Sequence, residues 1–127
     1  MGNNYATEKA LERDFVNWCK HLDIQCVKGP SMFAKGFPDR FWQLPKNGGT
    51  VYAEFKGTSY YGLTPMQKWW QRYLVASNPN RYFVIEDKAE LEALKKHCIQ
   101  LMEIGAKVVA YENKLLKELN SSVIIIP

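Results

Sequence analysis

The fold follows from residues 36–56, which read GFPDRFWQLPKNGGTVYAEFK. Two alternating apolar runs flank a turn-rich centre that contains an Asn-Gly pair. Such a pair between alternating apolar residues is a strong hairpin signal, so 39–44 and 50–56 are predicted to form adjacent antiparallel strands. Pairing of these strands brings Asp39 and Glu54 into one small volume. The hairpin therefore predicts a site that holds two carboxylates.

The residues around this pair suit phosphodiester chemistry. Glu54 and Lys56 are two apart on a strand, so their side chains share a face. Mg²⁺ prefers a few carboxylate oxygens and binds weakly until a substrate phosphate completes its shell. Asp39 and Glu54 are therefore candidate metal ligands, with the backbone carbonyl of Phe55 in reach of the same ion. Lys56 can hold the attacking water or the scissile phosphate. The alternative is a surface ion pair that contributes well under about 1 kcal/mol.

A helix is predicted from about Glu8 to Leu22, with Thr7 as its N-cap. Glu8 lies three residues before Leu11 and so extends the apolar stripe of this helix towards its N-terminus. In that place it can complete the metal site or ligate directly. The alternative is that an acidic residue in the first turn serves the helix dipole.

The remaining elements alternate between strands and helices. A second helix is predicted to start at Thr64-Pro65, where Gln67 completes a capping box. Its predicted apolar face consists of Met66, Trp69, Trp70, Tyr73 and Leu74. Trp69 and Trp70 are also candidates for stacking on bases, although helical spacing favours core packing for at least one of them. The third helix is predicted to open with a capping box at Asp87 and to end at Gly105. The other predicted elements are strands at 24–28 and 81–86, a strand or turn after 106, a short helix near 113–119 and a strand at 123–126. This order predicts a mixed α/β domain with helices packed on a small sheet.

The composition permits one folded domain that binds a polyanion. A chain of 127 residues is long enough for one real hydrophobic core, and no linker or repeat interrupts it, so 1–127 is expected to be a single domain. The net charge of +4 allows a nucleic-acid partner without requiring one. Ten of the 17 Lys and Arg residues lie between residues 9 and 72, around the predicted site, which predicts a phosphate-binding face there. The candidate contacts to DNA are Lys28, Lys35, Arg40 and Lys68, with Tyr60 and Tyr61 as candidates for stacking on bases.

The cysteines and histidines are not expected to carry chemistry. Cys19, Cys26 and Cys98 form no Cys-x-x-Cys pair, which argues against a zinc site. His21 and His97 are isolated and are predicted to lie on polar helix faces. Scattered free cysteines and the lack of a long apolar run predict a soluble protein of the cytoplasm, or of the host cytoplasm if it is phage-encoded, with no membrane partner.

The ordered set of motifs resembles the VRR-NUC nucleases of the PD-(D/E)XK superfamily, of the stand-alone phage or bacterial type similar to Holliday-junction resolvases. The resemblance covers about residues 5–97 and leaves an extension at about 98–127. The first predicted helix of this chain ends in Leu22-Asp23-Ile24, at a place where members of the family often have glycine. The motifs are Gly36-x-Pro38-Asp39-Arg40, Glu54-x-Lys56, Leu63-Thr64-Pro65-x-Gln67, the opening helix with Glu8, the strand that ends at Lys28, and the closing strand and helix over 81–94.

This resemblance implies a restriction-endonuclease-like fold with a small mixed central sheet flanked by helices. It implies a DNA endonuclease dependent on Mg²⁺ or Mn²⁺, with a preference for flap or branched DNA. Asp39 and Glu54 would ligate the metal, Glu8 would assist it, and Lys56 would be catalytic. Gln67 would lie at the active site, and its capping-box role is compatible with that.

Two other functions are compatible with the sequence. The first is a catalytically silent, nuclease-like module that binds DNA; intact Asp39, Glu54 and Lys56 argue against it. The second is a structural protein whose charges are surface pairs. A homodimer is expected for the nuclease, with the segment after residue 98 and its 123–126 strand as a candidate interface.

Overall fold

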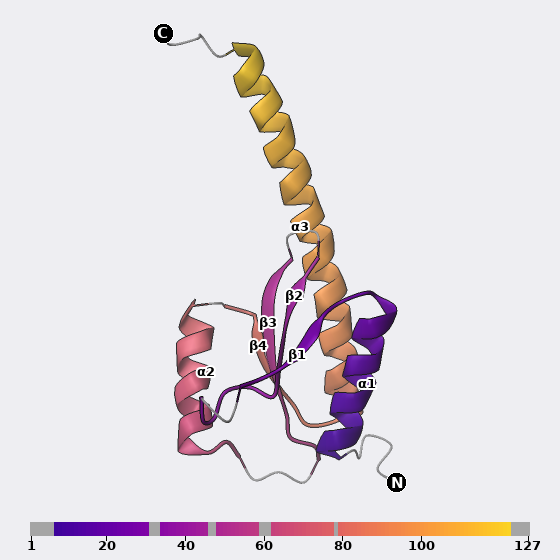
Figure 1. Ribbon diagram of the computed structural model, residues 1–127, viewed down its shortest axis with the longest axis vertical. Coiled ribbons are helices and arrows are strands. Elements are labelled where there is room, and N and C mark those ends of the chain that lie inside the picture. The colour runs from indigo at the N-terminus through magenta and orange to yellow at the C-terminus, as the bar shows by residue number, and fades with distance from the viewer. Residues whose placement is uncertain (1–6, 31–33, 46–47, 59–61, 78, 123–127) are drawn as a thin grey trace.

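The structure is a computed structural model that describes residues 7–30, 34–45, 48–58, 62–77 and 79–122. Its four-stranded sheet lies between α2 on one face and α1 with the first half of α3 on the other (Figure 1). This confirms the predicted mixed α/β architecture with a small sheet flanked by helices. The elements in chain order are α1 (Glu8–His21), β1 (Cys26–Lys28), β2 (Arg40–Leu44), β3 (Gly49–Phe55), α2 (Pro65–Ser77), β4 (Tyr82–Ile85) and α3 (Lys88–Ser122).

The sheet has the strand order β1-β2-β3-β4, in which β1–β2 and β2–β3 are antiparallel and β3–β4 is parallel. The predicted hairpin is confirmed, because β2 and β3 pair with Phe41 opposite Tyr52 and Arg40 opposite Ala53. Since side chains alternate along a strand, Tyr52 and Glu54 lie on the face of α2, and Ala53 lies on the face of α1 and α3.

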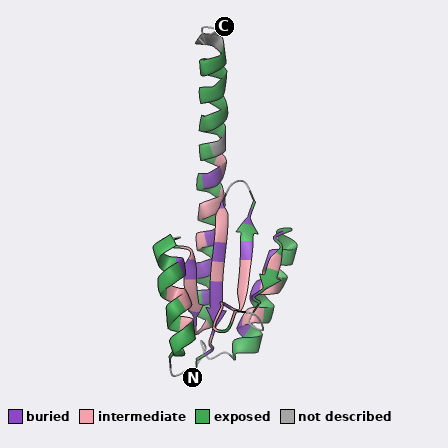
Figure 2. Cartoon of the chain, turned by 60° about the vertical axis from the view of Figure 1, so that its left-hand side comes forward, coloured by how far each residue is buried: buried purple, intermediate pink, exposed green. Residues whose placement is uncertain are grey.

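The hydrophobic core fills the space between the sheet and the pair α1 and α3. The Phe15 ring of α1 lies 4.5 Å from the Trp42 ring of β2 and 5.9 Å from the Phe55 ring of β3, measured between centroids. Leu91 and Leu94 of α3 complete this cluster and are buried. Figure 2 shows the buried residues concentrated on the sheet and on the helix faces that cover it. The core therefore holds the ends of β2 and β3 rigidly in place.

Helix starts follow the predicted capping residues. Thr7 Oγ1 accepts a hydrogen bond of 3.1 Å from Ala10 N at the start of α1. At the start of α2, Gln67 N donates to Thr64 Oγ1 at 3.2 Å and Thr64 N donates to Gln67 Oε1 at 2.9 Å, which confirms the capping box.

The start of α3 is a variant of the predicted box. Glu90 N donates to Asp87 Oδ1 at 2.9 Å, as the box requires. The Glu90 carboxylate, however, accepts from Glu86 N at 2.7 Å, one residue before the predicted partner. The third helix is thereby tied to the end of β4.

The predicted end of the third helix at Gly105 is wrong. α3 runs without interruption from Lys88 to Ser122, so neither a strand after 106 nor a separate short helix near 113–119 is formed. Gly105 is buried where the helix leaves the body, and one interior glycine costs a helix only about 1 kcal/mol. The residues after it include no proline before Pro127 and many good helix formers. The predicted strand at 123–126 lies outside the described residues.

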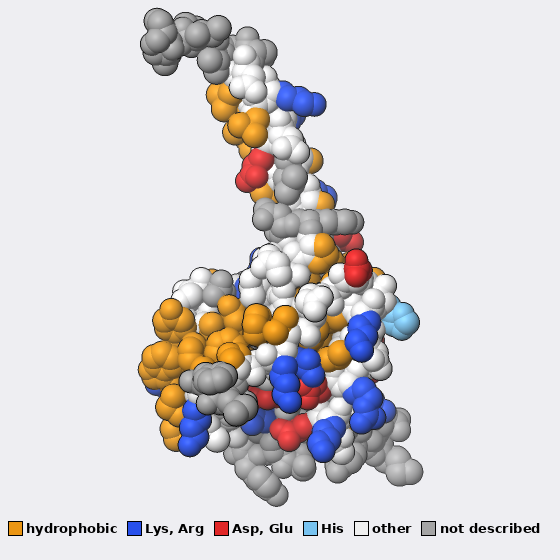
Figure 3. Space-filling model, viewed as in Figure 1, with side chains coloured by type: hydrophobic (Ala, Val, Ile, Leu, Met, Phe, Trp, Pro, Cys, Tyr) orange, Lys and Arg blue, Asp and Glu red, His pale blue; other side chains and the backbone are white. Residues whose placement is uncertain are grey.

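The predicted core positions of α2 are also partly wrong. Of the five residues predicted for its apolar face, Leu74 is buried, whereas Met66, Trp69 and Tyr73 are 43%, 47% and 55% exposed. α2 is the only described helix on its face of a narrow sheet, so nothing among the described residues covers its outer side. Figure 3 shows the resulting apolar surface over α2.

Two smaller predictions also need correction. Leu22, expected to be the last residue of the first helix, is instead its C-cap and is 40% exposed. His97, expected on a polar face, is half-buried, with its ring 5.3 Å from that of Phe83. Among the residues that the structure describes, no helix is both long and apolar enough to cross a membrane.

Candidate active site

Asp39 and Glu54, which we call the carboxylate pair, meet where β2 begins and β3 ends. Asp39 stands one residue before Arg40, and Glu54 one residue after Ala53, the register partner of Arg40. Asp39 Oδ2 accepts a hydrogen bond of 2.8 Å from Phe55 N, which fixes its carboxyl at the end of β3. The Asp39 carboxyl also lies close enough to hydrogen-bond the Glu54 carboxyl when one of them carries a proton. The predicted juxtaposition of these two side chains is present.

The motif before Asp39 sets the direction of the chain. Gly36 has φ +82° and passes so close to the backbone of Met66 that a Cβ there would collide with it. Only glycine combines this backbone conformation with this packing at little cost. Pro38 is buried, and the Asp39 carbonyl accepts a hydrogen bond of 2.7 Å from Gly29 N. The Gly-x-Pro-Asp sequence therefore constrains the backbone so that the Asp39 carboxyl has a fixed position.

The Glu54 carboxyl lies in the protein interior. Glu54 is 2% exposed, and its Oε2 has no hydrogen-bond partner among the described residues. Burial, together with the hydrogen bond and negative charge of Asp39, raises the pKa of Glu54 to about 9. A buried carboxyl with an unsatisfied oxygen costs free energy unless a proton or a cation neutralises it.

Lys56 and Glu8 both act on this buried carboxyl. The Lys56 ammonium lowers the pKa of Glu54, whereas the Glu8 carboxylate raises it, so both charges lie within electrostatic reach of Glu54. Lys56 is half-buried, and its backbone N–H donates to the Ile85 carbonyl at 2.9 Å. Glu8 is exposed at the first position of α1. The structure thus places four of the predicted site residues near the end of β3.

The donor set fits a hard divalent cation that takes part of its shell from water and substrate. Within the described ranges no group of three or more His, Cys, Asp or Glu side chains forms a metal cage. A closed structural zinc site, which needs four protein ligands, is therefore not formed by these residues. Mg²⁺ is commonly bound by one or two carboxylates plus waters and phosphate. Asp39 and Glu54 supply two carboxylates, and the unpartnered Oε2 of Glu54 is an oxygen that such a cation would satisfy.

Phe55 and Gln67 have structural roles that the structure shows. The Phe55 side chain is buried in the core. The backbone carbonyl of Phe55, which was predicted as a metal ligand, belongs to the residue directly after Glu54. Gln67 Oε1 is engaged by Thr64 N in the capping box of α2. A role of the Gln67 amide at the active site stays a prediction.

The predicted DNA contacts separate into two groups. Lys28 pairs with Arg40 in the register of β1 and β2, so both belong to the face of α1, opposite Glu54. Arg40 Nε lies 2.6 Å from Glu12 Oε2, so its charge is already paired. Lys68 is exposed on α2, and Lys35 is exposed in the segment that contacts this helix. Tyr60 and Tyr61 lie outside the described residues.

A basic groove runs along α1. The sequence predicted single contacts to DNA and did not predict this groove. It has a volume of about 310 Å³. Lys9, Arg13 and Lys20 recur at intervals of one and two helical turns, and this spacing was the signal in the sequence. The groove is lined by Lys9, Glu12, Arg13, Val16, Asn17, Lys20 and Arg40.

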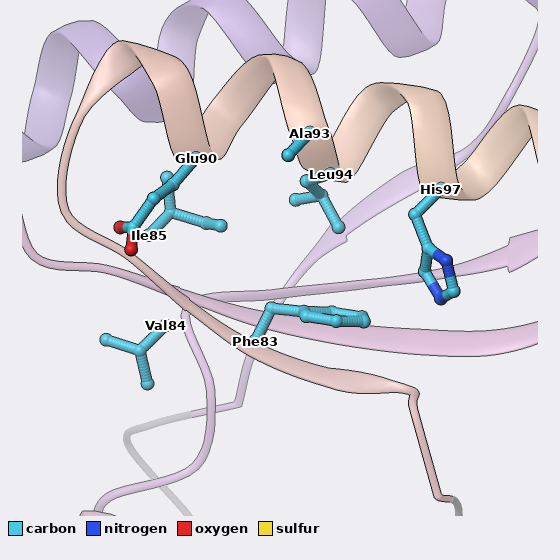
Figure 4. Close-up of a pocket in the computed structure, with 7 residues that line it drawn as sticks. All are labelled: Phe83, Val84, Ile85, Glu90, Ala93, Leu94 and His97. Carbon is cyan, nitrogen blue, oxygen red and sulfur yellow. The ribbon is translucent and has the colours of Figure 1, made fainter. Parts of the chain in front are cut away.

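A second cavity, of about 330 Å³, lies between β4 and α3 (Figure 4). Its walls are largely apolar, with Phe83 and Leu94 facing the space. Its two polar side chains make structural hydrogen bonds, Glu90 with Glu86 N and His97 Nε2 with the Asn80 carbonyl at 3.1 Å. Because its lining excludes the carboxylate pair, this cavity is not the candidate site.

Comparisons of the chain with protein-family models, curated proteins and solved structures found no match.

Proposed function

We propose that the chain is a divalent-metal-dependent endonuclease that hydrolyses phosphodiester bonds of DNA at the carboxylate pair. The observation that supports this most directly is the Glu54 carboxyl, buried beside Asp39 with one oxygen unpartnered among the described residues. Such an arrangement opposes folding, so a function that binds a cation there is its simplest explanation. The resemblance to VRR-NUC nucleases rests on the same residues. On the basis of this resemblance we also propose that residues 1–127 form one nuclease domain with a restriction-endonuclease-like fold.

Asp39 and Glu54, with the Phe55 carbonyl, would hold the Mg²⁺ or Mn²⁺ ion. When bound, this ion polarises the phosphate and supplies an activated water. The hydrogen bond from Phe55 N keeps one Asp39 oxygen fixed, so its other oxygen has a defined direction. Lys56 places a positive charge beside the pair, where it holds the attacking water or stabilises the charge that develops on the phosphate. Glu8 adds negative charge at the rim and assists retention of the cation.

The basic surfaces on either side of the sheet support a DNA substrate. Lys9, Arg13 and Lys20 line the groove of α1. On the other face of the sheet, Lys68 lies on α2 and Lys35 lies beside it. Lysine and arginine contacts to phosphates supply most sequence-independent DNA affinity. The resemblance implies flap or branched DNA as the substrate, which places duplex and unpaired segments in the same complex.

A cleavage panel tests this function. Single-stranded, duplex, flap and four-way DNA are incubated with Mg²⁺, Mn²⁺ or EDTA, using wild-type protein, Lys56→Ala, and Lys96→Ala as an exposed lysine control on α3. We expect cleavage with either metal, none in EDTA, a loss of about 100-fold or more in Lys56→Ala, and wild-type rates in Lys96→Ala. Equal cutting by Lys56→Ala and wild type would overturn the site. DNA binding without cleavage in any condition would replace the enzyme with a silent binding module.

A further inference from the structure

We propose that α2 presents a stacking platform for unpaired bases of single-stranded DNA, formed by the rings of Trp69 and Tyr73. This inference rests on the proposed function, because it names the part of the substrate that lies beside the nuclease site. Both side chains are about half exposed, at 47% and 55%. Rings that project from a helix in this way offer their faces to bases of any sequence.

The platform is rigid. The Trp69 and Tyr73 rings are nearly parallel, with 4° between their planes and 5.6 Å between their centroids. Behind them Trp70 stands almost perpendicular to both, at 87° and 85°. Trp70 is itself fixed, because its Nε1 donates to the Lys35 carbonyl at 3.1 Å and its ring packs 4.9 Å from that of Phe37. Little conformational freedom is therefore left to be lost when a base stacks.

The charges on α2 favour a nucleic acid as the occupant. Lys68 and Arg72 are both exposed, and each directly precedes one of the two platform rings. The 13 residues of α2 include no Asp or Glu. Aromatic rings interleaved with cations, and with no acid among them, match the bases and phosphates of a single strand.

The platform lies beside the segment that delivers Asp39 to the active site. Gly36 packs against the backbone of Met66 at the start of α2, and the next residue, Phe37, contacts Trp70. Pro38 and Asp39 follow directly. A strand that stacks on Trp69 and Tyr73 therefore runs next to the carboxylate pair, where its junction with a duplex can be cut.

The test measures binding apart from catalysis. Wild-type protein in EDTA is titrated with fluorescein-labelled oligothymidine and with a duplex of equal length, and fluorescence anisotropy reports both dissociation constants. We expect Trp69→Ala and Tyr73→Ala each to weaken oligothymidine binding about 5-fold or more. Duplex binding should stay within about 2-fold, and Trp69→Phe should retain most of the affinity because it keeps an aromatic face. Val75→Ala, which trims a 44% exposed aliphatic side chain of the same helix and leaves both rings in place, is the matched control.

Several outcomes would overturn the platform. Unchanged oligothymidine affinity in Trp69→Ala and Tyr73→Ala would do so, as would a change in oligomeric state, which would make this face a protein interface. Loss of oligothymidine binding in these variants, together with no cleavage in the panel above, would retain the platform and reject the nuclease. The two proposals therefore fail separately.

From a different observation, the outer half of α3, we infer that two copies of the chain associate through this helix. Figure 1 shows that it projects beyond the sheet, and the described residues from 110 to 120 are all exposed. Of the six exposed large apolar side chains described from residue 104 onward, five nevertheless form one stripe, at intervals of three or four residues. The α3 stripe consists of Ile104, Val108, Tyr111, Leu115 and Leu119, which are 58%, 40%, 66%, 41% and 48% exposed.

The spacing and charges identify a second, parallel copy as the partner. Ile104, Val108, Tyr111 and Leu115 follow the alternating three- and four-residue intervals of a heptad seam, with Val108 and Leu115 at position a. Lys107 then falls at position g and Glu112 at position e. In a parallel pair of helices these positions lie opposite each other, so Lys107 of each copy meets Glu112 of the other copy. An antiparallel pair would instead place g positions, and thus lysines, against each other.

Sedimentation equilibrium at about 5–100 µM tests the association. We expect a dimer for wild type and at least a 10-fold weaker dimer for Val108→Glu and Leu115→Glu. Asn113→Glu, on the opposite side of the seam, is the control and should stay dimeric. Lys107→Glu should weaken the dimer, and adding Glu112→Lys should restore it. A wild-type monomer at 100 µM, or a dimer that Leu115→Glu leaves unchanged, would overturn the inference.

Discussion

At the end of β3 a carboxyl lies in the protein interior, whereas on the outer faces of α2 and α3 aromatic and aliphatic side chains lie in water. Glu54 is 2% exposed, and Trp69 is 47% exposed. The first arrangement costs the folded state free energy, because a buried carboxyl loses its hydration. The second costs the fold little, since a ring that is about half exposed keeps much of its hydration and carries no charge to be desolvated.

This difference separates the two regions experimentally. A change at the carboxylate pair alters stability and chemistry together, because its residues are held by the core. A change on the exposed faces alters binding alone. The two regions should therefore respond differently to substitution, and a variant that responds like the other region would contradict this distinction.

The largest effect is expected from Asp39→Asn. The amide oxygen can still accept the hydrogen bond from Phe55 N, so the fold should be retained, but the negative charge that holds the cation is lost. Single-turnover cleavage with Mg²⁺ should fall by about 1,000-fold or more, equivalent to about 4 kcal/mol. Trp69→Ala should cut duplex DNA within about 3-fold of wild type. A variant Asp39→Asn that keeps a tenth of the wild-type rate would remove Asp39 from the metal site.

The next effect concerns stability. Phe15 is fully buried between the Trp42 and Phe55 rings, whereas Tyr111 is 66% exposed on α3. Phe15→Ala should lower the free energy of unfolding by about 3–5 kcal/mol because it leaves a cavity in the core. Tyr111→Ala should change that free energy by less than about 0.5 kcal/mol in a dilute, monomeric sample. Urea unfolding followed by circular dichroism measures both. A large loss in Tyr111→Ala would show that the outer half of α3 takes part in the fold.

A third prediction concerns pH and Glu54. The pKa of this carboxyl is about 9 in the folded chain, against an ordinary value of 4.5. Between these two pH values the folded state keeps a proton that the unfolded state has lost. The free energy of unfolding therefore falls as the pH rises through this window. Glu54→Gln removes the titration, so at pH 8 it should be more stable than wild type by roughly 1–3 kcal/mol. At pH 4 the two proteins should be equally stable.

Thermal unfolding at pH 4, 6 and 8 measures this difference, and Mn²⁺ provides the control. At pH 8 the ion should stabilise wild type, because it favours the ionised Glu54 carboxyl, and should stabilise Glu54→Gln much less. Equal pH dependence in the two proteins would show that Glu54 is not protonated in the folded state.

The same contrast explains how much the sequence could predict. The hairpin, the helix starts and the meeting of Asp39 with Glu54 follow from local signals, namely turn residues, capping boxes and period-two alternation. The exposure of Trp69 depends on how many elements cover α2, and apolar spacing along one helix does not contain that information. Gly105 was predicted to end a helix because glycine usually does so. It remains helical here because good helix formers follow it and because its position is buried against the body.

The smallest effect separates two roles of Gln67, at the point where α2 meets the segment that leads to Asp39. Thr64→Ala removes the side-chain oxygen that accepts from Gln67 N and should lower the free energy of unfolding by about 1 kcal/mol. Gln67→Glu keeps an oxygen for Thr64 N, so the capping box and the stability should be retained. If Gln67 acts only as a cap, this variant cleaves DNA at the wild-type rate. If its amide takes part at the active site, the rate falls about 10-fold or more, because an added carboxylate repels the phosphate. Urea unfolding and single-turnover cleavage of the same two variants therefore decide whether Gln67 only caps α2 or also acts at the active site.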